Sequence, residues 1–64
     1  MFEDIEIAIE KQILSLKQHD ITAMSLGNLY QAIRLAWGID RTTFGVLARD
    51  AAEAAGFEIL AESF

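Results

Sequence analysis

Few residue types that could carry out chemistry occur in this 64-residue sequence, and none comes at a catalytic spacing. There is no cysteine, and His19 is the only histidine. Thr22 and Ala23 follow it by three and four residues, so no second metal ligand stands at helical spacing. We expect His19 to lie at a helix end, beside the terminal carbonyls. The sequence therefore predicts no enzyme, no metal site and no cofactor.

Two further sets of residues allow both a chemical and a structural interpretation. Glu58 and Glu62 are paired carboxylates, but on a strand they would share one outer face, which is typical of solvated charge. Tyr30 and Trp37 could stack on a base or a ligand, yet they share a helical face with core residues, which favours burial. We expect no small-molecule substrate.

The basic residues near the middle of the chain are the remaining candidates. The net charge is −5, but residues 21–49 hold three arginines against one aspartate, whereas both flanking segments are acidic. An acidic protein gains little from the counterion release that drives most nucleic-acid binding, so net charge disfavours DNA. The candidate nucleic-acid contacts are Arg34, Arg41, Thr42 and Arg49.

Hydrophobic periodicity predicts the first of three helices over residues 2–18. Ser25 is a good N-cap, and the apolar stripe after it predicts a second helix over 25–37. Trp37 is followed by Gly38, which we expect to end that helix at positive φ.

A turn over 38–40 and an N-cap at Asp40 predict a third helix over 40–55. Alternation over 57–61 predicts a short strand, and its only internal partner would be a possible strand over 21–24. The expected fold is mainly α: a single domain over 1–64, with three helices and one or two short β-strands.

This order of elements resembles that of winged helix-turn-helix domains. The segment Ser-Leu-Gly-Asn-Leu-Tyr-Gln-Ala-Ile, followed by Gly-Ile-Asp-Arg-Thr-Thr-Phe, is similar to their second helix and turn. The resemblance implies that helix 40–55 is the recognition helix, exposing Arg41, Thr42, Gly45 and Arg49.

Two features depart from that family pattern. The sequence stops at Phe64, which leaves room for one strand and no returning strand, so the wing would be incomplete. Glu53 shares the exposed face of helix 40–55 and Asp50 is close by, and both would repel phosphate. In winged-helix-like folds without a wing and a basic surface, contact with proteins is a common use.

Several apolar residues are predicted to face away from the core. Ile7 and Leu14 point almost opposite the main stripe of the first helix. Leu35 points away from the stripe of the second helix, and the C-terminal strand leaves an edge open to another chain. The candidate partner interface is Ile7, Leu14, Leu35, Leu60 and Phe64.

We therefore expect a non-catalytic protein–protein interaction module, homodimeric or bound to another protein. One alternative is a DNA-binding transcriptional regulator that uses helix 40–55 and works as a dimer. Another is a small acidic inhibitor of a nucleic-acid-handling enzyme, for which carboxylates gathered on one face would be the sign. No apolar run is long enough to span a membrane, and the N-terminus lacks the basic region of a signal peptide, so a cytoplasmic protein is expected.

Overall fold

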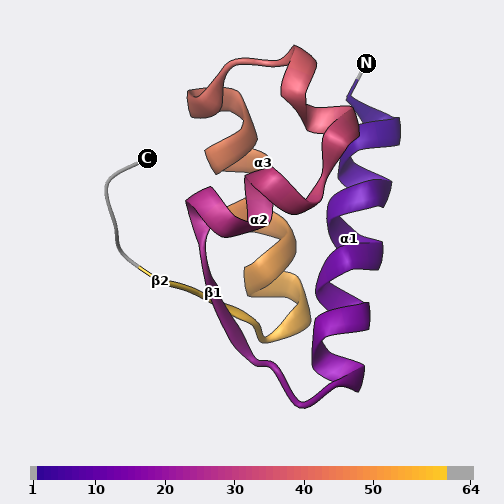
Figure 1. The fold of residues 1–64 in the computed structure, drawn as a ribbon, viewed down its shortest axis with the longest axis vertical. Coiled ribbons are helices and arrows are strands. Elements are labelled where there is room, and N and C mark those ends of the chain that lie inside the picture. The colour runs from indigo at the N-terminus through magenta and orange to yellow at the C-terminus, as the bar shows by residue number, and fades with distance from the viewer. Residues whose placement is uncertain (1, 61–64) are drawn as a thin grey trace.

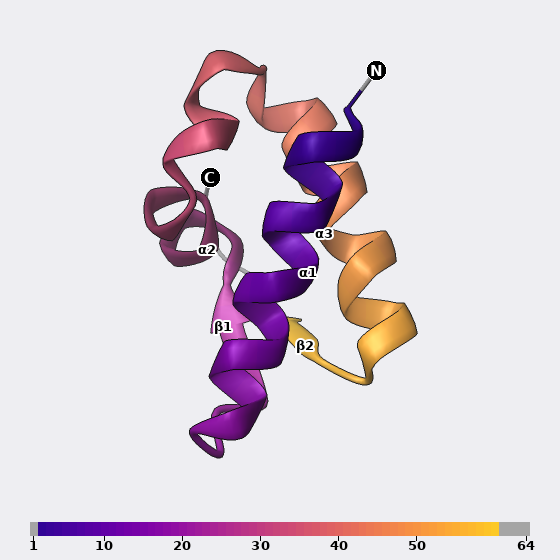
Figure 2. The same ribbon diagram turned by 90° about the vertical axis from the view of Figure 1, so that its right-hand side faces the viewer.

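Three helices and a pair of short strands make up the fold of the computed structural model, which describes residues 2–60 (Figure 1). Helix α1 covers Glu3–Gln18 and helix α3 covers Arg41–Ala55, and the two lie side by side in both views (Figure 2). The mainly α fold class is confirmed. The arrangement is compatible with a winged-helix-like domain.

The second helix is shorter than predicted. Helix α2 covers Leu26–Ala32 and stops at Ile33, whose φ of −116° and ψ of 90° are extended. A 3-10 helix, η1, follows over Arg34–Gly38. The prediction of one helix over 25–37 was therefore wrong, and so was the tight turn over 38–40, because eight residues with a helical turn of their own separate α2 from α3.

Capping residues fix where the elements begin and end. Ser25 accepts a hydrogen bond from the Asn28 amide at 3.2 Å, and Asp40 accepts one from the Thr43 amide at 3.0 Å, so both predicted N-caps are confirmed. Gly56 ends α3 at φ 69°, in the left-handed region. Among the glycines of the described residues, positive φ occurs at Gly56 and not at Gly38, which corrects the expectation for Gly38.

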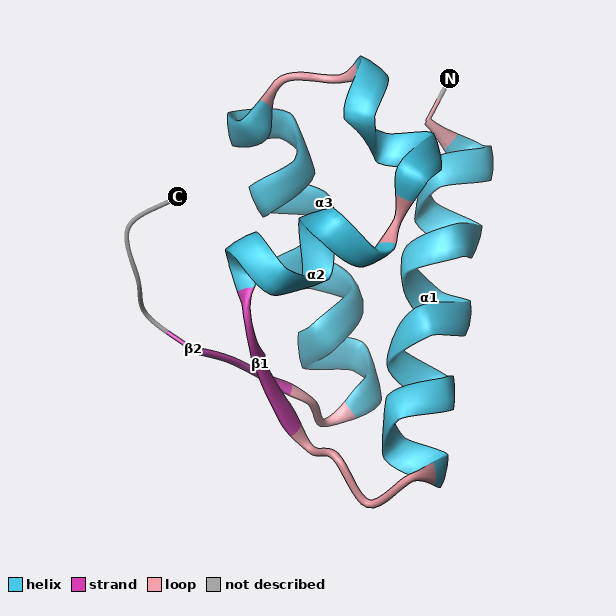
Figure 3. Cartoon of the chain, in the orientation of Figure 1, coloured by secondary structure: helices cyan, strands magenta, loops and turns pink. Residues whose placement is uncertain are grey.

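The two strands pair with each other, in parallel. Strand β1 covers Ala23–Ser25 and strand β2 covers Glu58–Leu60, and Met24 lies opposite Ile59 (Figure 3). The predictions of a strand in 21–24 and a strand in 57–61, each the partner of the other, were thus correct. The described pairs join Ala23–Ser25 to Glu58–Leu60, so β1 is shifted towards α2, and residue 61 lies outside the described residues.

The core lies between α1, α3 and the α2–η1 segment. Ile9 and Ile13 of α1 are fully buried, as the stripe of the first helix predicted. On α3, Phe44 is also fully buried, and its ring meets the Tyr30 ring edge-on at a centroid distance of 5.1 Å. The ammonium group of Lys17, near the end of α1, donates a hydrogen bond to the Ala55 carbonyl at the end of α3. This packing holds α1 against α3.

Candidate interaction surfaces

The predicted interface residues lie on different elements. Ile7 and Leu14 are exposed on α1, Leu35 is exposed on η1 and Leu60 is exposed on β2. Phe64 falls outside the described residues. The four described side chains are thus exposed as expected, and they come from three different elements.

An exposed aromatic site that the sequence did not predict is built on η1. Trp37 is 50% exposed, which corrects the expectation of a core residue. Its indole Nε1 donates a hydrogen bond to the Tyr30 carbonyl at 2.9 Å, and the Tyr30 hydroxyl donates one to the Trp37 carbonyl at 3.4 Å. The Arg34 guanidinium lies over the indole, 5.6 Å from the ring centroid. Leu35, which follows Arg34 in the chain, is 56% exposed. We call Arg34, Leu35 and Trp37 the aromatic knob.

The interruption of α2 explains the position of this tryptophan. In an unbroken helix the Tyr30 carbonyl would accept a bond from the amide four residues later. Here it accepts one from the Ile33 amide, at 3.2 Å, and one from the Trp37 indole. The indole therefore satisfies a carbonyl at the end of α2, and this bond holds its ring at the surface.

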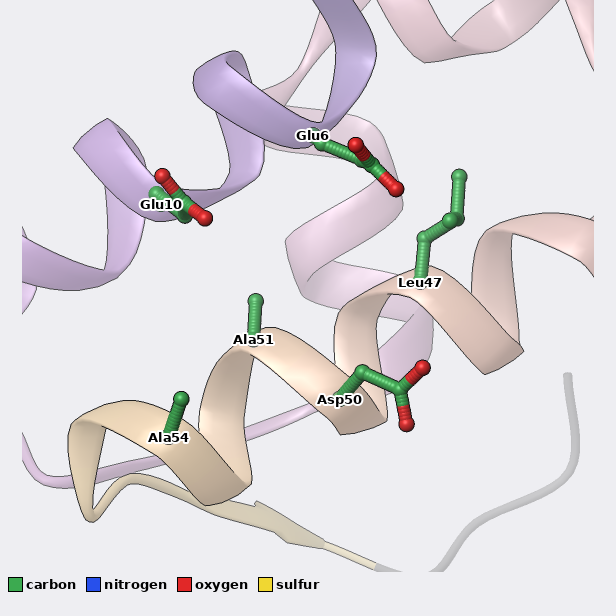
Figure 4. A pocket seen from close by; sticks show the side chains of 6 residues that line it. All are labelled: Glu6, Glu10, Leu47, Asp50, Ala51 and Ala54. Carbon is green, nitrogen blue, oxygen red and sulfur yellow. The ribbon is translucent and has the colours of Figure 1, made fainter. Parts of the chain in front are cut away.

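A groove with an acidic rim runs between α1 and α3 (Figure 4). Its first hollow, of about 210 Å³, has carboxylates on both helices, and a second of about 270 Å³ adjoins it and ends at Leu14, which is 55% exposed. We call this the acidic groove, lined by Glu6, Glu10, Leu47, Asp50, Ala51 and Ala54.

Three of the four predicted nucleic-acid contacts come together on the other side of α3. Arg41, Thr42 and Arg49 line a hollow of about 270 Å³ with Leu26, Gly45 and Val46. Arg34 is not among them, because its guanidinium lies on the Trp37 ring. Gly45 is buried under neighbouring side chains, which corrects its expected exposure, and the exposed apolar residue of this face is Val46.

The ionisable side chains of Asp40 and His19 each form hydrogen bonds to nearby residues. Hydrogen bonds from the Thr43 hydroxyl, at 2.7 Å, and from the Thr43 amide lower the pKa of the Asp40 carboxyl below its usual 3.8. His19 Nδ1 donates to the Ser15 carbonyl at 2.8 Å, at the end of α1. In the part of the chain that the structure describes, no three His, Cys, Asp or Glu side chains are placed to share a metal ion.

The acidic side chains are only partly gathered. Three line the acidic groove, whereas Asp20, Asp40 and Glu58 stand at the end of α1, before α3 and on β2. Glu62, the predicted partner of Glu58, lies outside the described residues.

No protein-family model, curated protein or solved structure matches this chain. Within residues 2–60, no helix combines the length and the hydropathy needed to cross a membrane. The candidate surfaces are therefore interpreted from their own geometry.

Proposed function

We propose that this chain is a non-catalytic protein–protein interaction module that includes self-association among its contacts. The observation that carries the proposal is the aromatic knob. Tryptophan, tyrosine and arginine are the residue types that contribute most to binding energy at protein interfaces. Here Trp37 and Arg34 present that chemistry at the surface, and Leu35, which lies between them in the chain, is also exposed.

The rigidity of the knob supports this assignment. An exposed side chain must be ordered when it binds, at a cost of about 0.5–1.5 kcal/mol for each flexible one. The indole of Trp37 is already held by its bond to the Tyr30 carbonyl, and Arg34 already lies against its ring. A partner that covers this site therefore loses less to ordering than it would on a mobile surface.

A site-specific cross-linking experiment tests the proposal. A photoreactive phenylalanine analogue replaces Leu35 in the knob, Arg49 on the basic face of α3, or Glu58 on β2 as the control position. We expect discrete protein adducts, including dimers of the chain itself, from position 35 and none from position 58. Adducts that nuclease removes, formed at position 49 and not at 35, would contradict the proposal.

DNA binding is the second candidate function, favoured by the convergence of Arg41, Thr42 and Arg49 around one hollow. If α3 enters a groove of DNA, Arg41→Ala and Arg49→Ala each weaken duplex binding. Each also reduces the slope of log affinity against log salt concentration by about 1, the amount expected for the loss of one phosphate contact. The absence of any salt-dependent duplex binding at low ionic strength would remove this candidate.

The acidic-inhibitor alternative needs carboxylates gathered on one face, and their dispersal beyond the acidic groove gives it no support.

A further inference from the structure

We infer that the chain self-associates head to tail, with the aromatic knob of one copy seated in the acidic groove of the next. The inference rests on the proposed function and names both surfaces of the contact. It assigns a role to the groove between α1 and α3, which the sequence did not predict.

The acidic groove has the shape and polarity to accept a large apolar side chain with a cation beside it. Its floor is made of the small residues Ala51 and Ala54, so a bulky ring can approach the α3 backbone closely. Leu14 extends the apolar surface at one end. Figure 4 shows Glu6 and Glu10 reaching in from α1, opposite the side chains of α3. The groove therefore combines an apolar floor with a negative rim.

The aromatic knob is the complementary surface. Trp37 and Leu35 supply bulky apolar groups, and the Arg34 guanidinium supplies one positive charge next to the indole. A tryptophan side chain buries up to about 250 Å² when it is covered, the largest contact area that any side chain offers. The knob thus brings apolar area and charge in the arrangement that the groove accepts.

Charge favours the knob-to-groove contact over the two symmetric contacts, groove to groove and knob to knob. Groove against groove would set Glu6, Glu10 and Asp50 of one copy against the same three carboxylates of another. Knob against knob would set Arg34 against Arg34. Like charges brought face to face disfavour both symmetric contacts, whereas knob against groove brings opposite charges together.

The positions of the two surfaces make the contact heterologous. In Figure 2, α1 is in front, the α2–η1 segment is on its left and α3 is on its right, so the knob-bearing segment and the groove lie on different sides of α1. One contact uses the knob of one copy and the groove of the other. A free knob and a free groove remain, so association continues beyond the dimer into rings or open chains.

Sedimentation of the purified chain and of two variants tests the inference. The knob variant carries Trp37→Ala and Arg34→Glu, and the groove variant carries Glu10→Lys and Asp50→Lys. Over about 10 µM to about 1 mM, the wild-type average mass is expected to rise past that of a dimer. Each variant alone is expected to associate at least about 30-fold more weakly, the loss typical of removing one interface hot spot.

Mixing the two variants gives the decisive result. The knob variant keeps its groove and the groove variant keeps its knob, so an equimolar mixture is expected to form a dimer and nothing larger. The matched control, Glu53→Lys with Glu58→Lys, makes the same change in charge outside the groove and is expected to assemble as wild type. Circular dichroism checks that each variant is folded, and Ala54→Phe, which fills the exposed groove, is a second groove variant.

The inference would be overturned by a wild-type chain that stays monomeric to about 1 mM, by a mixture that associates no more than its components, or by a control variant that fails to assemble. A dimer that persists in both variants would also overturn it, because other surfaces would then hold the copies together. That last outcome leaves the proposed interaction function intact.

Discussion

Replacing Gly45 by alanine tests the packing of α3 against α2 with an effect whose sign is not obvious. Gly45 is buried in the middle of α3, and a Cβ there would lie 3.1 Å from Arg49 Nη1 and 3.4 Å from Leu26 Cδ2. The second distance is an ordinary contact. The first is close, but it involves the far end of a flexible, exposed side chain, which can shift by a few tenths of an ångström.

We therefore expect Gly45→Ala to stabilise the fold. Alanine is favoured over glycine inside a helix by about 0.5–1 kcal/mol, because glycine loses more backbone freedom on folding. A shift of the Arg49 guanidinium does not offset that gain, since the side chain remains in solvent. For a domain of this size, a gain of about 1 kcal/mol raises the melting temperature by roughly 4–8 °C.

Gly56→Ala is the matched control, with the opposite sign. A Cβ at Gly56 meets nothing within 4 Å, but φ is 69°, a left-handed conformation that alanine adopts at a cost of about 1–2 kcal/mol. Urea denaturation of both variants measures the two effects. A Gly45→Ala variant that is less stable than wild type would refute the reasoning, because Arg49 or Leu26 would then be unable to yield.

Three further predictions concern the caps and the core. Ser25→Ala removes the acceptor for the Asn28 amide and is expected to lower the free energy of unfolding by about 0.5–2 kcal/mol in urea denaturation; an unchanged value would contradict the cap. The hydrogen bonds from Thr43 lower the folded-state pKa of Asp40. Their contribution to stability is therefore complete above the unfolded-state pKa of about 3.9 and is lost as the pH falls through the folded-state pKa. An NMR titration of the folded chain in which the Asp40 midpoint is at or above 3.8 would contradict this. Phe44→Ala empties a fully buried site at a cost of about 3–5 kcal/mol, a large part of the stability of a domain this small, and near-UV circular dichroism is expected to show loss of fixed packing.

Local signals in the sequence were enough to predict α1, α3 and their ends. The stripe that includes Ile9 and Ile13 has helical spacing, Asp40 is a strong N-cap, and Gly56 ends α3 in a left-handed conformation. The pairing of the two strands was also predictable, because only two segments in the chain have strand character. The helix signals depend on residues that are close in sequence, whereas the strand pairing joins Ala23–Ser25 to the distant Glu58–Leu60.

The break at Ile33 could not be predicted in the same way. Residues 26–37 carry an uninterrupted helical stripe and no proline, so the local pattern favours one helix. The folded chain instead buries Ile33 and Ala36 and turns Trp37 outward, with its indole bonded to the Tyr30 carbonyl. That choice depends on how the segment packs against α1 and α3, which no local spacing records.

Of the candidate surfaces, too, some follow from the local sequence and others only from the packing of the helices. The exposure of Ile7 and Leu14 follows from helical geometry alone, and the structure confirms it. The acidic groove depends on Glu10 and Asp50 meeting across two helices that are far apart in the sequence, so only the packed structure brings it into view.

The fluorescence of Trp37 tests the central claim most directly, because it is the only tryptophan in the chain. If the aromatic knob is an interaction surface, its emission shifts to shorter wavelength and acrylamide quenches it less as the concentration of the wild-type chain rises. The groove variant, Glu10→Lys with Asp50→Lys, keeps the emission of the free chain over the same range. A wild-type emission that stays constant while the mass rises would contradict the account, because assembly would then leave Trp37 uncovered.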